Sequence, residues 1–319
     1  MDSKDYWEKR EREALAEYIT EEKEYTKELN RIYDNTLSQI QKEIESFYQK
    51  YASDEGITMS EAMKRVSKLD IKEYEAKAKR YVKEKDLSDR ANAEMKLYNL
   101  TMKVNRLEML NSRIGLALVD GYDQVEKSLE NDLYKRAMDE YTRQAGILGE
   151  SVIHPEEKAT ELVNASYKWA KANYGFSEAL WTHQVVLKSE LSKLLQQGLI
   201  QGKGPRALAP ELRKVFNVSR YAAERLMRTE LSRVQTGAQM DSFKANGYDK
   251  YMYITLSSAA YTKSKVCPIC RPLNGEVFDV KGAEIANPAH PLPPMHPNCR
   301  CSISAYMDPD KFEEWLASQ

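Results

Sequence analysis

All four cysteines of this chain lie in one short stretch, between Cys267 and Cys301, and the 266 residues before that stretch contain none. They form two groups. The first is C-P-I-C, which ends at Cys270, and the second, after a gap of 25 residues, is H-P-N-C-R-C, which starts at His296. Each group can present two ligands from one tight turn, so the chain must fold back for the turns to meet. The spacing predicts a tetrahedral metal site, and zinc is the metal that sulfur-rich ligation favours.

The sequence leaves the exact ligand set open. The expected ligands are Cys267, Cys270, His296 and Cys299. Cys301 follows Cys299 by two residues and would face the same side of a strand, so it could replace either His296 or Cys299. His290 is a weaker substitute. We expect a structural Zn²⁺, because a catalytic metal needs an open coordination position and a nearby base, and no H-E-x-x-H motif occurs.

Other uses of the cysteines fit the sequence less well. A redox C-x-x-C pair needs a βαβ context that the pattern lacks. A disulfide framework is the weaker interpretation, because the first residues, MDSKDYWEKRERE, show no secretory signal. Burial as small apolar side chains does not explain why the cysteines cluster at two turns.

Residues 1–52 predict one long helix, since they hold neither glycine nor proline and are dense in Glu, Lys and Arg. Apolar residues recur there at steps of three and four, on one stripe of a helix: Tyr33, Leu37, Ile40, Ile44, Phe47 and Tyr51. The stripe is too short to require an extended coiled coil, so we expect it to pack on neighbouring helices. A short helix should follow Gly56, and a second long helix should run from about Ser88 to Gln144.

Shorter elements follow a break at residues 146–155. Helices are predicted at 156–174, 177–197, 207–216 and 219–246, with Gly198 and Gly247 near the C-terminal caps of the second and the fourth. After Gly247 the pattern predicts strands at 251–256, 275–280 and 301–306. The proline-rich stretch between Pro288 and Pro297 predicts a loop.

The predicted fold is mainly α with a small α+β module. We expect a long-helix N-terminal region over 1–150, a helical domain over 151–247, and a β-containing Cys/His metal module over 248–319. The 48 basic and 49 acidic residues leave a net charge of −1, which excludes a generic polycation that coats nucleic acid. No apolar run approaches the roughly 18–20 residues that span a bilayer, so no membrane partner is expected.

Three stretches between Trp181 and Cys301 carry a family resemblance. The first is WTHQVVLKSELSKLLQQGLIQGKGPRALAPELRKVF; the second is AERLMRTELSRVQTGAQMDSFKANG, with R-T-E at 228–230; the third pairs CPICRPLNGEVF with PPMHPNCRC. Together they cover about 120 residues. They resemble the phage head-morphogenesis family, minor head proteins similar to the F protein of phage Mu. One departure is Lys263, which stands where the family often has an acidic residue.

The resemblance implies a non-enzymatic virion or procapsid protein of a tailed double-stranded DNA phage or prophage, present in the host cytoplasm during assembly. It implies docking at the portal vertex, with the portal protein and other head proteins (capsid, scaffold) as partners, and in some cases a part in DNA packaging or delivery. From the residues themselves, Arg228 and Glu230 could orient their helix against the metal module, and Glu230 could pair with Arg233 at i+3.

Two functions of other classes stay open. A zinc-module nucleic-acid-binding protein could make weak contact with double-stranded DNA through basic residues near the site: Lys263, Lys265, Arg271 and Arg300. A metal-dependent nuclease or hydrolase would need a carboxylate base, for which Glu276 and Asp279 are the nearby candidates.

Overall fold

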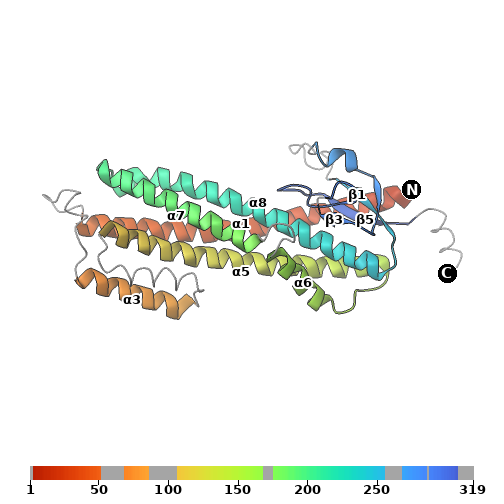
Figure 1. Ribbon diagram of the computed structural model, residues 1–319, viewed down its shortest axis with the longest axis horizontal. Helices are drawn as coiled ribbons and strands as arrows, with labels where there is room; N and C mark the ends of the chain where they lie inside the picture. Colours follow the sequence, from red (N-terminus) through yellow and green to blue (C-terminus); the bar gives the residue numbers. More distant parts are fainter. Residues whose placement is uncertain are drawn as a thin grey trace. The chain divides into compact units, whose positions relative to one another are not determined.

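Long helices dominate the computed structural model, which describes residues 3–51, 68–85, 106–167, 175–255, 268–285 and 287–307. The helices are α1 (Ser3–Tyr51), α3 (Lys68–Lys85), α5 (Arg106–Leu148), α6 (Pro155–Tyr167), α7 (Phe176–Ile200) and α8 (Pro205–Ala245). The strands are β1 (Lys250–Ile254), β2 (Val277–Asp279), β3 (Glu284–Ile285), β4 (Pro291–Leu292) and β5 (Ser302–Tyr306), with a 3₁₀ turn η1 (Arg271–Leu273). Figure 1 shows these elements along the chain. The predicted class, mainly α with a small C-terminal strand region, is confirmed.

The chain divides into two compact units, and each combines segments that are distant in the sequence. The first, called the sheet unit below, consists of Met1–Thr26, Leu129–Glu178 and Glu224–Gln319. The second, called the helix unit, consists of Lys27–Ser128 and Ala179–Ala223. The long helices therefore contribute one part to each unit. The three-part division expected from the sequence stays a prediction.

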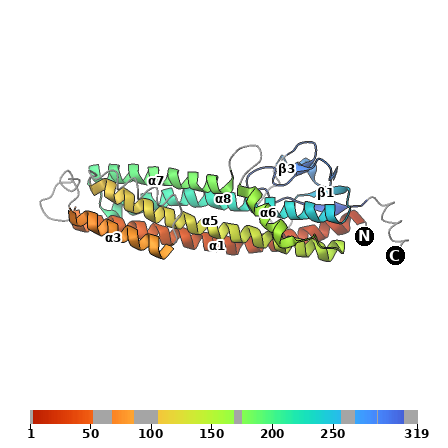
Figure 2. The same cartoon turned by 60° about the horizontal axis from the view of Figure 1, so that its bottom comes forward.

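In the helix unit, parts of α1, α5, α7 and α8 run side by side (Figures 1 and 2). Aromatic rings from these helices pack together between them. The Tyr33 ring of α1 lies 5.9 Å from that of Tyr122 on α5 and 6.4 Å from that of Phe216 on α8, both edge to face. The predicted stripe of α1 is buried from Tyr33 to Phe47. The stripe thus packs on neighbouring helices, as predicted from its length.

Two expected boundaries of α7 and α8 were wrong. Gly198 lies inside α7, where an added Cβ would meet the Leu208 side chain, and the cap is Gly202, at φ +66°. The Lys203 N–H donates to the Gly198 carbonyl at 2.8 Å, as a glycine-capped helix end requires. Residues 207–216 and 219–246 belong to one helix, α8, and Ser219 lies inside it rather than at a helix start. Its hydroxyl instead lies within hydrogen-bonding distance of the Tyr122 hydroxyl in the core.

The sheet unit is built around β1, the central strand of an antiparallel sheet with the order β2-β1-β5. Both faces of β1 are buried. Tyr251 and Tyr253 pack in a cluster with Phe243 of α8, and Met252 and Ile254 pack against α1. Strands are therefore confirmed in all three of the predicted segments, although their ends differ. The sequence explains this burial, because the four consecutive large apolar or aromatic residues 251–254 leave no polar face to expose.

The other predictions for this region have mixed outcomes. Gly247 ends α8 at φ +70°, and the Tyr248 N–H donates to the Phe243 carbonyl at 2.9 Å, so the predicted cap is confirmed. The proline-rich stretch was expected to be loop throughout, but Pro291 and Leu292 form β4 and pair in parallel with β3. Proline is tolerated there because the pair is short and at an edge. The expected helix after Gly56 and the expected start of the second long helix lie outside the described residues.

Among the described helices, none combines the length and the apolar composition that crossing a membrane requires.

Candidate functional site

Three buried cysteines converge at one point of the sheet unit. The sulfur atoms of Cys270, Cys299 and Cys301 all lie within 4.8 Å of one another, and none is in a disulfide. We call this group the cysteine cluster. Cys270 precedes η1, whereas Cys299 and Cys301 come from the turn that leads into β5. Residues about thirty positions apart are thus brought together, and such a group of ligands could hold a metal ion.

The spacing of the sulfurs fits a thiolate-ligated metal. In a tetrahedral zinc site with Zn–S bonds of about 2.3 Å, two sulfurs are about 3.8 Å apart. The Cys270 and Cys299 sulfurs are 3.9 Å apart. That separation is about twice the length of a disulfide bond. The donor set of the cluster, which is rich in sulfur and buried, therefore fits zinc.

The turn that carries Cys299 has the residues its geometry needs. The Cys299 N–H donates to the His296 carbonyl at 3.1 Å and closes a four-residue turn. Pro297 occupies the second position, and Asn298 the third, at φ +64°. Proline presets the second position of a type II turn, and asparagine tolerates the left-handed conformation of the third. The H-P-N-C sequence thereby fixes the direction in which the Cys299 side chain leaves the backbone.

The pKa values of the three thiols are shifted in different directions. Hydrogen bonds from the Cys270 and Cys301 side chains lower the pKa of Cys299 to about 2, and backbone N–H groups of Cys301 and Met295 add to the effect. The bond to Cys299 raises the pKa of Cys270 to about 12. The pKa of Cys301 is also raised, by its bonds to Cys270 and Cys299 and by burial. One thiolate is thus available without a metal, and a cation would displace the other two protons.

Tyr253 closes the cluster on the side of the sheet. Its hydroxyl lies 3.6 Å from the Cys270 sulfur, within the range of an O–H···S hydrogen bond. Burial raises the pKa of Tyr253, and the neighbouring Cys301 adds to this shift, so the phenol keeps its proton and acts as a donor. If a metal displaced the proton of Cys270, this donor would stabilise the negative charge of the thiolate, which is the usual role of groups just outside a metal's ligands.

The structure brings together part of the predicted ligand set. Cys270, Cys299 and Cys301 form the cluster, whereas His296 and His290 are not among its members. The His296 Nδ1 lies 2.8 Å from the Pro297 carbonyl oxygen. Cys267 lies outside the described residues, so the complete ligand set stays a prediction.

Among the described residues named for the alternative functions, Arg271 is exposed beside Cys270, and the others lie outside the cluster or form an ion pair. Glu276 and Asp279 are exposed and do not belong to the group of potential ligands. The Arg300 guanidinium donates to Glu22 of α1 at 2.7 Å. Lys263 and Lys265 lie outside the described residues.

The R-T-E segment of α8 contacts residues 296–301, called the cysteine turn below, through its middle residue. The Asn298 N–H donates to the Thr229 hydroxyl at 3.1 Å, and so binds the turn directly to the helix. Glu230 is fully buried and pairs with Arg233 at 3.0 Å, the i+3 pair expected from the sequence. Sequence reasoning singled out the two charged residues and missed Thr229. A side-chain oxygen that accepts a hydrogen bond from the backbone of a distant turn cannot be recognised from the spacing of residues in the sequence.

The comparison with family models decides the relationship of this region. Residues 189–304 match the family described as Phage Mu protein F like protein. The match confirms the resemblance predicted for this region, and it spans the cysteine cluster, about half of α7 and the whole of α8. The family match indicates a role in phage head morphogenesis. No curated protein and no solved structure matches the chain at a significant level.

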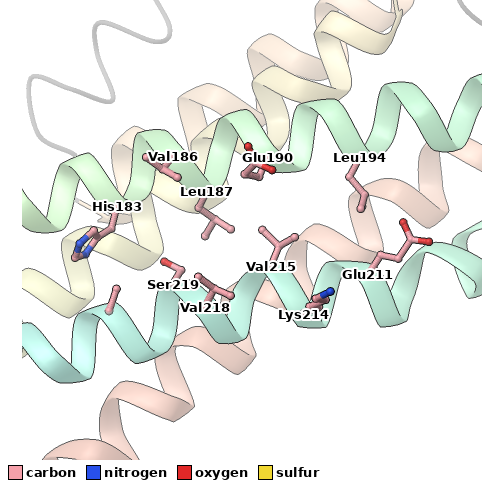
Figure 3. Close-up of a pocket in the computed structure, with 11 residues that line it drawn as sticks. His183, Val186, Leu187, Glu190, Leu194, Glu211, Lys214, Val215, Val218 and Ser219 are labelled. Carbon is pink, nitrogen blue, oxygen red and sulfur yellow. The ribbon is translucent and has the colours of Figure 1, made fainter.

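The Mu F-like region also contributes to an apolar groove in the helix unit. The groove lies between α7 and α8 and has a volume of about 550 Å³. Figure 3 shows Leu187 and Leu194 pointing from α7 toward α8, and Val215 pointing back from α8. Val186 and Val218, on its two walls, are 56% and 69% exposed. Glu190, Glu211 and Lys214 add charged groups to its lining.

Proposed function

We propose that this protein is a non-enzymatic minor head protein that docks at the portal vertex during procapsid assembly. The match of residues 189–304 to the Mu F-like family carries the proposal. In this role the protein resides in the procapsid interior and then in the virion. Its contribution to packaging or delivery of DNA would follow from that position at the vertex.

The metal is proposed as a structural Zn²⁺ held by Cys270, Cys299 and Cys301 and completed by Cys267. The cluster already supplies three sulfurs, and Cys267 precedes Cys270 at the C-x-x-C spacing of a zinc knuckle. His296 then becomes a turn residue rather than a ligand. The metal would hold a sheet of three short strands whose own core is small.

The groove between α7 and α8 is proposed as the docking surface for an amphipathic helix of the portal protein. Most of its lining belongs to the region that matches the head-protein family. An apolar groove between two helices with exposed valines on its walls accommodates the apolar face of a third helix. Large apolar side chains that stay exposed on one face commonly mark a protein contact.

A binding experiment tests this function. The full chain and the portal protein of the same phage are mixed, and complex formation is followed by light scattering coupled to size-exclusion chromatography. Val218→Asp places a charge in the groove and should reduce affinity at least tenfold, whereas Ile153→Asp, at an exposed apolar site outside the groove, should not. Equal binding by the two variants would contradict the assignment of the groove, and no binding by the unaltered protein would contradict portal docking.

A further inference from the structure

The cysteine turn has two sides, and only one faces the cluster. Cys299 and Cys301 contribute their sulfurs to the cluster, and the residues that alternate with them, Arg300 and Ser302, make their contacts with helices. Alternation of this kind follows from extended backbone, in which successive side chains point to opposite sides. Any ion bound by the cysteines would therefore fix the same backbone that positions these two polar side chains.

Arg300 is held by a carboxylate from the other end of the chain. Its Nη2 and Nε lie 2.7 Å and 3.1 Å from the same Glu22 oxygen. Glu22 is 7% exposed and also lies 3.8 Å from the Arg228 Nε on α8. The carboxylate is thus placed between two guanidinium groups. A buried charge in such a place is costly to leave unpaired, so the loss of one partner weakens the contact strongly.

Ser302 makes the second contact with α1. Its hydroxyl donates to the Glu11 carboxylate at 2.6 Å, and the Gln239 amide of α8 donates to both of these residues at 2.9 Å. Ser302 is fully buried and Glu11 nearly so. The Arg143 guanidinium, 2.8 Å away, balances the charge of Glu11. Strand β5 therefore starts at a residue fastened to two helices, directly after Cys301.

We propose that the metal centre also anchors the N-terminal segment of α1, residues 3–26, and that Glu22 and Glu11 act as positioning residues for Cys299 and Cys301. The inference rests on the proposed metal site and goes beyond its role as a clamp for the sheet. Binding of the metal orders the cysteine turn, and the ordered turn holds α1 through Arg300 and Ser302. Because coupling between two events is reciprocal, α1 in turn raises the affinity for the metal.

The coupling links two residues that are far apart in the sequence. Glu22 and Arg300 are 278 positions apart, so they meet only when the first and last parts of the sheet unit are assembled. Groups that orient metal ligands from outside typically change metal affinity by about 10- to 100-fold when removed. We expect the lower end of that range for Glu22, since Arg300 is partly exposed.

The test uses the full chain and two readouts. The first is the zinc dissociation constant, measured by competition with a chromophoric chelator. Glu22→Gln, which keeps the size of the side chain, and Arg300→Ala, which removes its partner, should each weaken binding about tenfold. Glu17→Gln makes the same chemical change at an exposed site on α1 and should leave affinity unchanged. Far-UV circular dichroism checks that each variant remains folded.

The second readout is backbone hydrogen exchange in residues 3–26, with and without chelator. Removal of zinc should speed exchange in this segment of the unaltered protein, and Glu22→Gln should speed it even with zinc bound. Unchanged zinc affinity in both variants, or exchange that is indifferent to zinc, would overturn the anchoring while leaving the metal site intact. Absence of zinc from the unaltered protein would overturn the metal site, and the anchoring with it.

Discussion

At the scale of single residues, the cysteine turn shows how a short motif can specify a site. Pro297 and Asn298 set a turn that aims Cys299, and extended backbone aims Cys301 to the same side. The spacing in the sequence was sufficient to predict that cysteines of the two groups meet and which residues compete as metal ligands. The choice between His296 and Cys301 was not decidable, because it depends on which way each side chain leaves the turn.

Tyr253 provides a residue-scale prediction. Tyr253→Phe removes the hydroxyl that reaches the Cys270 sulfur, so zinc affinity should fall several-fold and the free energy of unfolding by about 1 kcal/mol. Tyr251→Phe is the matched control, since this hydroxyl donates to the Pro291 carbonyl instead, at 3.1 Å. It should reduce stability similarly and leave zinc affinity unchanged. Competition titration and urea unfolding measure the two quantities, and a weaker zinc affinity in both variants would argue against a specific role for Tyr253.

The thiol protons predict how zinc binding depends on pH. Because the pKa values of Cys270 and Cys301 are raised, both thiols keep their protons at neutral pH without metal, whereas Cys299 with its lowered pKa is already ionised. Zinc must displace the two protons, so affinity should rise with pH, by about two logarithmic units per pH unit between pH 6 and 8. Cys267, the proposed fourth ligand, also gives up a thiol proton and so steepens the slope toward three. Isothermal titration in buffers of different ionisation enthalpy counts the released protons, and a slope near zero would contradict thiolate ligation.

At the scale of elements, the sequence predicted which segments are helical better than it predicted where the helices begin and end. The stripe of α1 and the cap at Gly247 follow from local patterns that any helix shares. The positions of Gly198 and Ser219 were misjudged in the same way. Gly198 was expected near a helix end and Ser219 at a helix start, but both lie inside helices, where Gly198 faces Leu208 and Ser219 faces Tyr122.

Replacing either of two glycines inside α5 by alanine should change the stability of the protein, in opposite directions. An added Cβ at Gly121 would collide with the buried Thr36 side chain of α1, so Gly121→Ala should destabilise the protein by roughly 1–3 kcal/mol. Gly146 has nothing within 4 Å of an added Cβ, so Gly146→Ala should stabilise it by about 0.5–1 kcal/mol through helix propensity. Thermal and urea unfolding measure both. Stabilisation by both changes would show that α1 and α5 do not approach each other as closely as described.

At the scale of the whole molecule, the sheet unit joins the first and last parts of the described chain around the cysteine cluster. The motif in the sequence indicated the cluster, and the family resemblance indicated the region that the Mu F-like match now covers. Neither pointed to Glu22 or Glu11, because an ion pair across 278 positions has no local pattern. The contacts of α1 with Arg300 and Ser302, beside the cysteines, could be found only from the assembled fold.

The measurement that tests the central claim most directly is the zinc content of the purified full chain, determined by elemental analysis beside Cys301→Ser and His296→Ala. The account predicts one zinc per chain in the unaltered protein and in His296→Ala. It predicts loss of zinc in Cys301→Ser. The backbone amides of β1 and β5 should then exchange their hydrogens faster than in the unaltered protein. A chain that contains no zinc, or that keeps it in Cys301→Ser and loses it in His296→Ala, would contradict the cysteine cluster as the metal centre.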